Sequence, residues 1–455
     1  MRLTGGEQST ALLTDHYELT MVQAALHSGT AGRRSVFELF GRRLPEGRRY
    51  GVVAGTGRML DALERFNFDE DTLEALRERD VVDAPTLDWL AGYRFAGDIW
   101  GYAEGEVYFP GSPLLVVEAS FAEAVVLETL FLSILNHDSA IASAASRMTS
   151  AADGRPCIEM GSRRTHEEAA VAAARAAYIA GFASSSNLAA GDRYGIPTTG
   201  TSAHAFTLLH DNERDAFTAQ VASLGPGTTL LVDTYDLAEA VAAAIEIAGT
   251  DLGAVRIDSG DLPLRARQVR EQLDRLGATG TQIVVTSDLD EYAIAGLAAA
   301  PVNAYGVGTS LVTGSGRPTC GFVYKLVARA SDVDGALQSV AKKSQDKLSI
   351  GGRKWALRRR SPDGVAELEV IGIGEMPADD GDDRELLVQL VAKGEVVGRE
   401  TLAAARDRHT RARDELPIVA RQLSRGEPAI ATRYIADSRP TDGSRLSSTA
   451  VEDQR

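Results

Sequence analysis

Polar side chains that could do chemistry recur in the middle of the chain, each time directly after a short apolar run. Four such runs are TLLVDTY (229–235), AVRIDSG (254–260), QIVVTSD (282–288) and AYGVGTS (304–310). They are too short for core helices and too continuous for half-exposed strands, so they predict buried parallel strands crossed over by helices. In a closed (β/α) barrel the carboxyl ends of all strands open onto the face that holds the active site. We expect that face to collect His204, Asp233, Tyr235, Asp258, Asp261, Ser287, Asp288 and Thr309.

Each of these residues has a simpler explanation, which is that it only caps the helix that follows. Capping accounts for Ser287 or Asp288 taken singly, whereas the whole set, with a histidine and two glycine-rich turns, favours a site. His204 follows Gly-Thr-Ser-Ala at 200–203, a presumed strand end, and opens a helical pattern that continues to residue 209. A neutral imidazole in that position can act as a general base or accept a phosphoryl group.

Three further features point to phosphate or ribose chemistry. The turn GVGTS at 306–310 presents backbone N–H groups without side-chain obstruction, as anion-binding turns of barrels do. Arg163 and Arg164 could clamp a phosphate or pyrophosphate, although a helix-start or interface salt bridge explains them equally well. Asp258 and Asp261 could hold ribose hydroxyls or Mg²⁺ carried by a phosphorylated substrate, or could only shape their turn.

Composition excludes several classes of protein. The chain has 455 residues, 44% of them hydrophobic, enough for two or three domains with their own cores. A formal net charge of −16 argues against a nucleic-acid partner. Cys157 and Cys320 are the only cysteines, which excludes a disulfide framework and a cysteine zinc site and suits a reducing cytoplasm. We expect neither secretion nor a membrane span, and the zinc-hydrolase and P-loop motifs do not occur.

The chain divides into three predicted regions and a tail. Residues 1–136 mix helix and strand, residues 137–327 carry the barrel, residues 328–435 begin with a basic stretch, and residues 436–455 are expected to be disordered. In the first region we expect a helix capped by Asp15, a helix over 50–66, antiparallel strands over 96–117 and a helix over 121–135 that leads into the barrel. The basic stretch comprises Lys342, Lys343, Lys347, Arg353, Lys354, Arg358, Arg359 and Arg360. A helical pattern around 400–423 follows it.

Taken together, these segments resemble the nicotinate phosphoribosyltransferases of the actinobacterial type. The resemblance runs from about residue 11 to about residue 360 and keeps one order throughout. The matching segments are LLTDHYELTM (12–21), FELFGRRLP (37–45), SILNHDS (133–139), GSRRTH (161–166), SSSNLAAGDRYGIPTTGTSAHAF (184–206), LLVDTYD (230–236), VRIDSGDL (255–262), TSDLDEY (286–292), YGVGTSLVTG (305–314) and VYKLV (323–327).

The resemblance implies a type II phosphoribosyltransferase fold, which is an irregular (β/α) barrel joined to an α/β sandwich domain. The sandwich would combine the N-terminal region with the segment after the barrel, and the protein would be a cytoplasmic homodimer with shared active sites. The implied reaction transfers phosphoribosyl from phosphoribosyl pyrophosphate to nicotinate, giving nicotinate mononucleotide and pyrophosphate for NAD salvage. ATP hydrolysis would be coupled to it through a phosphohistidine, with Mg²⁺ accompanying both phosphorylated substrates.

The same resemblance implies roles for individual residues. His204 resembles the phosphorylated histidine, and Tyr17 and Thr201 resemble contacts to nicotinate. Asp258 resembles a ribose contact, and Gly308 with Thr309 resembles the turn that holds the 5′-phosphate. Arg163 and Arg164 resemble the clamp on the anion.

Two other kinds of function stay open at this stage. Within the same fold the base could be nicotinamide or quinolinate, and the second carboxylate of quinolinate would call for an extra cationic pocket. The other alternative is a non-catalytic barrel homologue, which would be expected to have lost His204, Asp258 or the turn at 306, and all three are present.

Overall fold

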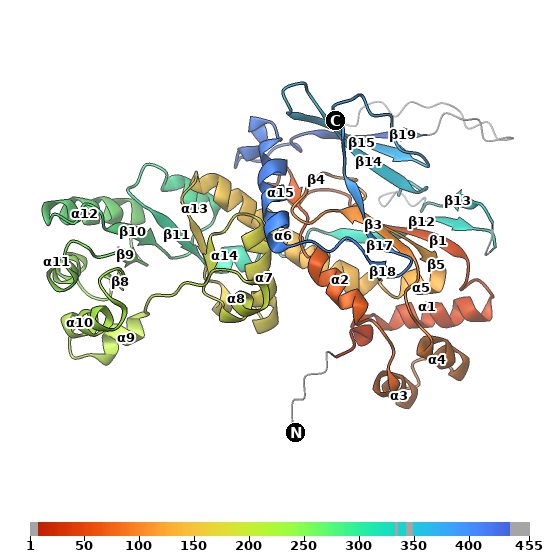
Figure 1. Ribbon diagram of the computed structural model, residues 1–455, viewed down its shortest axis with the longest axis horizontal. Coiled ribbons are helices and arrows are strands. Elements are labelled where there is room, and N and C mark those ends of the chain that lie inside the picture. The colour runs from red at the N-terminus through yellow and green to blue at the C-terminus, as the bar shows by residue number, and fades with distance from the viewer. Residues whose placement is uncertain (1–7, 333–334, 343–348, 437–455) are drawn as a thin grey trace.

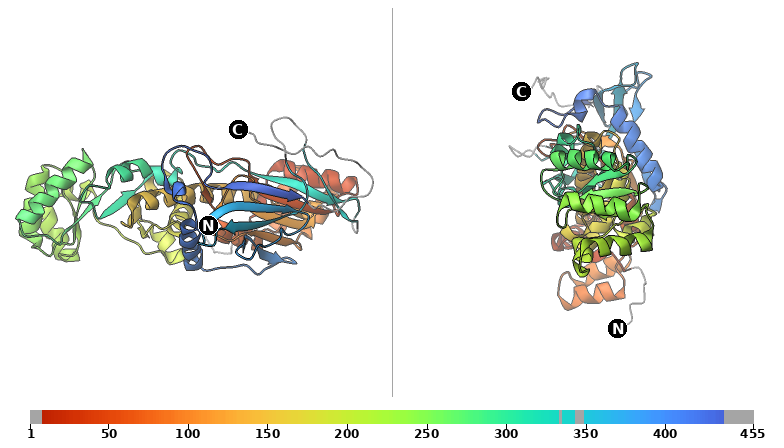
Figure 2. Two further views of the ribbon diagram at one scale, coloured as in Figure 1. Left: turned by 90° about the horizontal axis from the view of Figure 1, so that it is seen from above. Right: turned by 90° about the vertical axis from the view of Figure 1, so that its left-hand side faces the viewer.

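The computed structural model describes residues 8–332, 335–342 and 349–436. The molecule is elongated, with mainly antiparallel sheets at one end and a parallel sheet at the other (Figures 1 and 2). The predicted tail beyond residue 436, together with Lys343 and Lys347 of the basic stretch, lies outside the described residues.

The larger antiparallel sheet joins strands from the N-terminal region with strands that come late in the chain. In spatial order its strands are β13 (Leu337–Ser339), β12 (Phe322–Ala330), β1 (Arg34–Gly41), β5 (Leu115–Ser120), β3 (Asp98–Tyr102), β17 (Leu387–Ala392) and β18 (Glu395–Val396). β1 pairs with both β5 and β12, so segments almost 300 residues apart share one core. The predicted antiparallel strands over 96–117 are confirmed as β3, β4 (Val107–Tyr108) and the start of β5.

A four-stranded sheet lies beside the first and is tied to it by buried charges. Its strands are β16 (Arg384–Glu385), β14 (Lys354–Arg360), β15 (Ala366–Ile373) and β19 (Ala431–Ala436). Arg358 is fully buried and donates to Glu369 at 2.8 Å, which also accepts from the Tyr102 hydroxyl at 2.8 Å. Lys354 is buried too and donates to Glu38 at 2.5 Å. Lys354 therefore links the two sheets directly, and Arg358 does so through Glu369, which bonds to Tyr102 of the larger sheet.

Short helices surround the sheets in the N-terminal region. They are η1 (Ala11–Leu13), α1 (His16–His27), α2 (Thr56–Glu64), α3 (Glu70–Glu78), α4 (Ala84–Ala91) and α5 (Phe121–Val125). The predicted helix over 50–66 is partly wrong, because it starts with β2 (Gly51–Val52), which pairs with β4. Asp15 precedes α1 as expected, but its carboxylate accepts from the Thr129 hydroxyl at 3.0 Å instead of capping the helix.

The parallel sheet is a half-barrel that stays open on one side. In spatial order its strands are β7 (Ser184–Ser185), β6 (Cys157–Glu159), β11 (Ala304–Val307), β10 (Gln282–Val285), β9 (Ala254–Ile257) and β8 (Thr229–Leu231). β7 and β8 follow each other in sequence but form opposite edges, so the expected closed ring is an open, curled sheet. Its helices are η2 (Ser162–Arg164), α7 (Glu167–Ile179), α8 (Leu188–Tyr194), α9 (His204–Leu209), α10 (Glu213–Leu224), α11 (Leu237–Ala248), α12 (Leu262–Arg275), α13 (Glu291–Gly296) and α14 (Thr309–Val312).

One long helix, α6 (Glu128–Ala152), runs from the antiparallel part into the half-barrel. The predicted end of this helix near residue 135 is wrong, since Asp138 continues it as a buried partner of Arg58 at 2.8 Å. Residues 121–152 are long and apolar enough to cross a membrane by length and composition, but 61% of the apolar 18-residue window within them is buried inside the protein, as in a core helix. The predicted domain boundary at residue 136 falls inside α6, and the predicted boundary at residue 327 falls inside β12. The division into domains stays a prediction.

A buried ion pair fastens the antiparallel part to the half-barrel. Arg175 of α7 donates to both carboxylate oxygens of Glu104, at 2.6 and 2.7 Å, and both residues are buried. Glu104 also accepts from the backbone N–H of Gly55 at 2.6 Å. Close by, α15 (Leu402–Asp414) and η3 (Ile418–Arg421) pack between the two parts, confirming the helical pattern around 400–423.

We expect Arg175→Met to lower the free energy of unfolding by about 3–5 kcal/mol, because it leaves the Glu104 carboxylate buried without its cation. Denaturant midpoints followed by circular dichroism measure the loss. The matched control is Arg193→Met, which breaks the ion pair between Arg193 and Glu168. These two side chains are 48% and 62% exposed, so the substitution should lower the free energy of unfolding by less than about 1 kcal/mol. Similar small losses in both variants would show that the buried pair does not hold the two parts together.

Candidate active site

Parallel pairing places the ends of β8, β9 and β10 side by side. Asp233, Asp258 and Thr286 leave these neighbouring strands at the same edge. The Asp233 carboxylate accepts from the backbone N–H of Asp258 at 2.9 Å and from the Ser259 hydroxyl at 2.7 Å. The Thr286 hydroxyl donates to Asp258. The three strand ends are thus locked together by their own side chains, and two carboxylates stand close to each other.

His204 reaches this edge as the first residue of α9. The expected strand before it is reduced to a single parallel bridge between Thr198 and Ser185, and residues 199–203 form a loop that leads to His204. Its Nε2 lies 3.9 Å from Asp233 Oδ1 and 3.8 Å from Asp258 Oδ2, while Nδ1 lies 3.1 Å from the Thr234 hydroxyl. Asp233 Oδ1 is buried and has no hydrogen-bond partner among the described residues. The imidazole is 40% exposed, so a ligand group can reach Nε2.

Arg256 of β9 is a site residue that the sequence analysis missed. Its guanidinium donates to the Thr201 hydroxyl at 2.9 Å and to the next backbone carbonyl at 3.2 Å. Burial lowers the pKa of Arg256, Asp258 and Asp233 oppose that shift, and nearby Arg163 adds to it. The buried Nε has no hydrogen-bond partner in the described part of the chain. The site therefore holds a cation with an unused donor next to Thr201, which suits a carboxylate.

Glu213, the first residue of α10, was missed as well. Burial, followed by the charges of Asp233 and Asp236, raises the pKa of its carboxyl to about 7. Its Oε1 is buried and unpartnered among the residues that the structure describes. Near neutral pH, Glu213 therefore holds a proton for part of the time, beside the carboxylate that faces His204.

The arginine turn after β6 lies beside the glycine turn after β11, because these two strands pair in parallel. A Cβ added to Gly161 would lie 3.1 Å from the Gly308 carbonyl oxygen, so the two turns are in close contact. Thr309 is exposed at the start of α14. Arg163 and Arg164 are exposed, and nothing in the described chain forms a hydrogen bond or ion pair with either side chain. This edge of the site can bind an anion, which favours the clamp over a structural salt bridge.

The other predicted strand-end residues lie at the same edge in lesser roles. Asp261 caps α12 through a backbone N–H at 3.1 Å, so the capping explanation applies to it. Ser287 has a φ of 128°, a strained conformation for a residue with a side chain. Neither Ser287 nor Asp288 caps α13, because Asp290 does so. Tyr235 and Asp288 are exposed.

Tyr17 is not brought to this site within one chain. It lies on α1, and α1 and α9 are at opposite ends of the elongated molecule (Figures 1 and 2). Partial burial and the neighbouring Glu128 and Glu18 raise the pKa of its exposed hydroxyl, which stays neutral. A role for Tyr17 beside His204 therefore requires a second copy of the chain.

The family model and the curated relatives that match this chain are named for nicotinate phosphoribosyltransferase. Residues 12–136 match the family model of the nicotinate phosphoribosyltransferase (NAPRTase) N-terminal domain. Nicotinate phosphoribosyltransferase pncB1 of Mycobacterium tuberculosis is 59% identical over 438 residues, covering 94% of this chain and 96% of that protein. The nicotinate phosphoribosyltransferase of Bacillus subtilis is 37% identical over 363 residues, covering 77% of this chain and 74% of that protein.

Two solved structures share the fold. Human nicotinic acid phosphoribosyltransferase superposes with a TM-score of 0.79 at 24% identity, covering 93% of this chain and 98% of that one. Nicotinate-nucleotide pyrophosphorylase from Pyrococcus furiosus gives 0.72 at 22% identity, covering 91% and 98%. They confirm the predicted irregular α/β barrel joined to an α/β sandwich. Together with the identity to the curated relatives, which spans nearly the whole length, this shows that the chain belongs to the nicotinate phosphoribosyltransferase family.

Proposed function

We propose that this protein transfers phosphoribosyl from phosphoribosyl pyrophosphate to nicotinate, giving nicotinate mononucleotide and pyrophosphate in NAD salvage in the cytoplasm. The observation that carries the proposal is the strand-end cluster of His204, Asp233 and Asp258 with Arg256 and Thr201 beside it. Family membership supports the same reaction. The intact cluster also argues against a non-catalytic homologue.

The transfer breaks the bond between ribose C1 and pyrophosphate and forms a bond from the pyridine nitrogen to C1. Positive charge develops on the ribose ring and negative charge on the leaving group. Arg163 and Arg164 stabilise the departing pyrophosphate together with the Mg²⁺ that the substrate carries. Asp258 holds the ribose, and the turn at Gly308 and Thr309 receives the 5′-phosphate. The pyridine nitrogen is already nucleophilic and needs only to be positioned.

Arg256 and Thr201 favour nicotinate as the base. A guanidinium with a free donor and a hydroxyl at 2.9 Å from it can bind one carboxylate. An amide in the same place would leave the cation uncompensated, which disfavours nicotinamide. Quinolinate would need a second cation for its second carboxylate.

ATP hydrolysis is coupled through His204 in this proposal. Nδ1 is engaged with Thr234, so Nε2 is the nitrogen that attacks the γ-phosphorus of ATP. The new P–N bond forms as the bond to ADP breaks, and water later cleaves the phosphohistidine to release phosphate. The added charge beside Asp233 and Asp258 reorders the nearby loops and favours binding of phosphoribosyl pyrophosphate with its Mg²⁺.

A homodimer with shared sites would bring Tyr17 to the pyridine ring of the partner's substrate. Large apolar side chains are exposed both in the N-terminal region and on the helices of the half-barrel. Leu12, Leu13 and Tyr17 lie at the N-terminal end, and Leu188, Leu208 and Leu209 lie on α8 and α9. Burying these faces against each other would favour a two-fold dimer.

Removing the charge of Arg256 should change the choice of base. In Arg256→Gln we expect the KM for nicotinate to rise by about 10- to 100-fold, while the weak use of nicotinamide stays nearly constant, because only the carboxylate needs the cation. Steady-state assays with both bases measure this. Arg267→Gln on α12 is the matched control and should behave as the parent protein, because the Arg267 side chain is exposed and forms no hydrogen bond or ion pair in the described part of the chain. Equal losses with both bases would contradict the assignment.

His204→Ala should separate the two reactions. We expect basal nucleotide synthesis to persist at reduced efficiency, while ATP hydrolysis and stimulation by ATP disappear, since only the coupling needs the imidazole. Labelled ATP and nucleotide product are measured in parallel. His210→Ala, which removes the histidine at the other end of α9, should keep both activities. Unchanged incorporation of label into the His204 variant would rule out His204 as the phosphorylated residue.

Mixing two inactive variants tests whether active sites are shared. After subunit exchange, a mixed dimer of Tyr17→Ala and Asp258→Ala has one site with both lesions and one with neither, so activity should partly return. Mass spectrometry checks the exchange. A mixture that exchanges and stays inactive would mean that each site is completed by its own chain.

A further inference from the structure

A polar cavity of about 220 Å³ lies apart from the site around His204. Its walls come from the segment before β2, from α6, from the turns before α13 and after α14, and from Arg425 near the end of the described chain. None of its described lining residues is one that contacts His204 or Arg256. The cavity therefore needs an explanation of its own.

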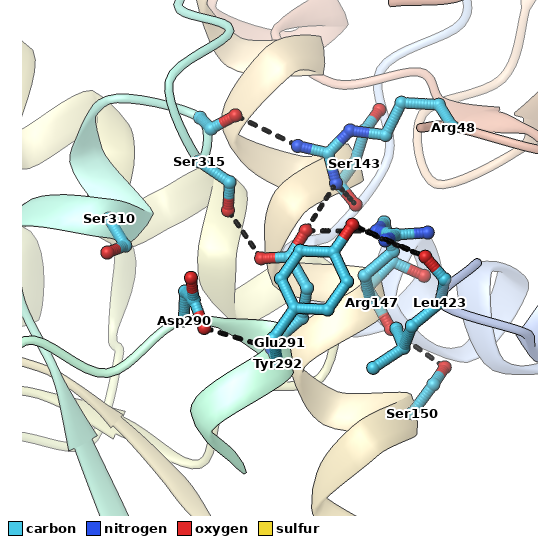
Figure 3. Close-up of polar contacts among 12 residues, drawn as sticks. Arg48, Ser143, Arg147, Ser150, Asp290, Glu291, Tyr292, Ser310, Ser315 and Leu423 are labelled. Atoms are coloured by element: carbon cyan, nitrogen blue, oxygen red, sulfur yellow. Dashed lines mark hydrogen bonds and ion pairs between the residues drawn. The ribbon is translucent and has the colours of Figure 1, made fainter. Parts of the chain in front are cut away.

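The inner wall carries more positive than negative charge. Arg48 and Arg147 are both buried, and the carboxylate of Glu291 lies between them (Figure 3). Arg147 Nε donates to Glu291 Oε1 at 3.0 Å, and Arg48 NH1 lies 3.6 Å from the same oxygen. Burial lowers the pKa of Arg48, Glu291 opposes that shift, and the charge of Arg147 adds to it. Two buried guanidinium groups thus share the Glu291 carboxylate, and their other hydrogen bonds go to neutral groups, including the backbone carbonyls of Ser143, Gly314 and Leu423. Among the described residues no second acid pairs with either arginine, so one of the two positive charges has no paired counter-ion.

Hydroxyl groups complete the wall, and two of them hold the charged groups in place, since the Tyr292 hydroxyl also donates to the Leu423 carbonyl at 3.3 Å. Ser315 donates to Glu291 at 2.6 Å, and the Tyr292 hydroxyl lies 3.3 Å from Arg147 (Figure 3). Ser310 lines the cavity one residue after Thr309. The lining acid Asp290 is committed to the backbone N–H groups at the start of α13.

The rim of the cavity, formed by Glu46, Arg317 and Arg425, also carries more positive than negative charge. Arg317 and Arg425 both pair with Glu46, at 2.6 and 2.5 Å, so two exposed arginines share one carboxylate. An anion that approaches the cavity meets four arginines on the way in.

We propose that this cavity binds a phosphate-class anion, either inorganic phosphate or the terminal phosphate of a larger molecule. Guanidinium groups and hydroxyls are the donors that recognise such oxygens, and the unbalanced buried cation supplies the driving force. Asp290 and Ser310 belong to the turns after β10 and β11, which also carry Ser287 and Thr309. A bound anion would contact these turns on the side away from His204 and stabilise the positions of Ser287 and Thr309 at the active site.

Thermal unfolding of the full-length protein with inorganic phosphate tests the proposal, with chloride at equal ionic strength as the reference. Phosphate should raise the melting temperature, because it binds only the folded state. In Arg147→Gln the apparent Kd for phosphate should rise at least about tenfold, since a charged hydrogen-bond donor is lost. The rim variant Arg317→Gln/Arg425→Gln changes only exposed side chains, so it should fold normally and also bind phosphate more weakly.

Arg163→Gln/Arg164→Gln is the matched control, because it removes two arginines from the anion clamp of the active site. Phosphate should still stabilise this variant, and the rim variant should keep its basal activity without phosphate. If the clamp variant loses the stabilisation while the cavity variants keep it, phosphate binds at the active site and the proposal fails. A parent protein that phosphate does not stabilise overturns it equally. Titrations with pyrophosphate and ATP show whether the occupant is free phosphate or part of a larger molecule, and all these readouts are independent of nicotinate transfer.

Discussion

The parallel register of β8, β9 and β10 is the constraint on which the site depends. Because the strands start and end together, Asp233, Asp258 and Thr286 meet at one edge and bond to one another. A one-residue slip of β9 would turn Asp258 to the other face of the sheet and bring Arg256 out of contact with Thr201. The same edge receives His204 from a loop, so the chemistry relies on a rigid sheet and one docked helix.

Much of this arrangement could be predicted from the sequence, because each strand–helix unit has a recognisable pattern of apolar and polar residues along the chain. The apolar runs at 229–235, 254–260 and 282–288 contain β8, β9 and β10, and the helices expected to cross over between them are α11 and α12. The helix opening at His204 is also confirmed. Local sequence patterns suffice to predict the elements where a buried strand alternates with an amphipathic helix, because the spacing of apolar residues that identifies each element involves only residues close together in the chain.

The rest depended on contacts between distant segments. Arg256 stands inside an apolar run and looked like part of a strand, and only its distance to Thr201 reveals its role. Glu213 looked like an ordinary first-turn acid, and its raised pKa comes from Asp233 on another element. The helix expected to end near residue 135 continues because Asp138 finds Arg58, 80 residues earlier in the chain. No local sequence pattern indicates that the barrel stays open between β7 and β8.

The electrostatics of the site show how a chain of net charge −16 can handle polyanionic substrates. The few arginines that can contact an anionic substrate are gathered at the strand-end edge. Arg163 and Arg164 there have no acid bound to them in the described structure. In the proposed ATP coupling, the acids next to His204 would be the obstacle, because a phosphoryl group on that histidine would add about 1.5 to 2 negative charges beside Asp233. Glu213, with a pKa of about 7, can take up a proton when that charge arrives. Proton uptake at Glu213 would offset part of the repulsion, so under this proposal phosphorylation of His204 and protonation of Glu213 would favour each other.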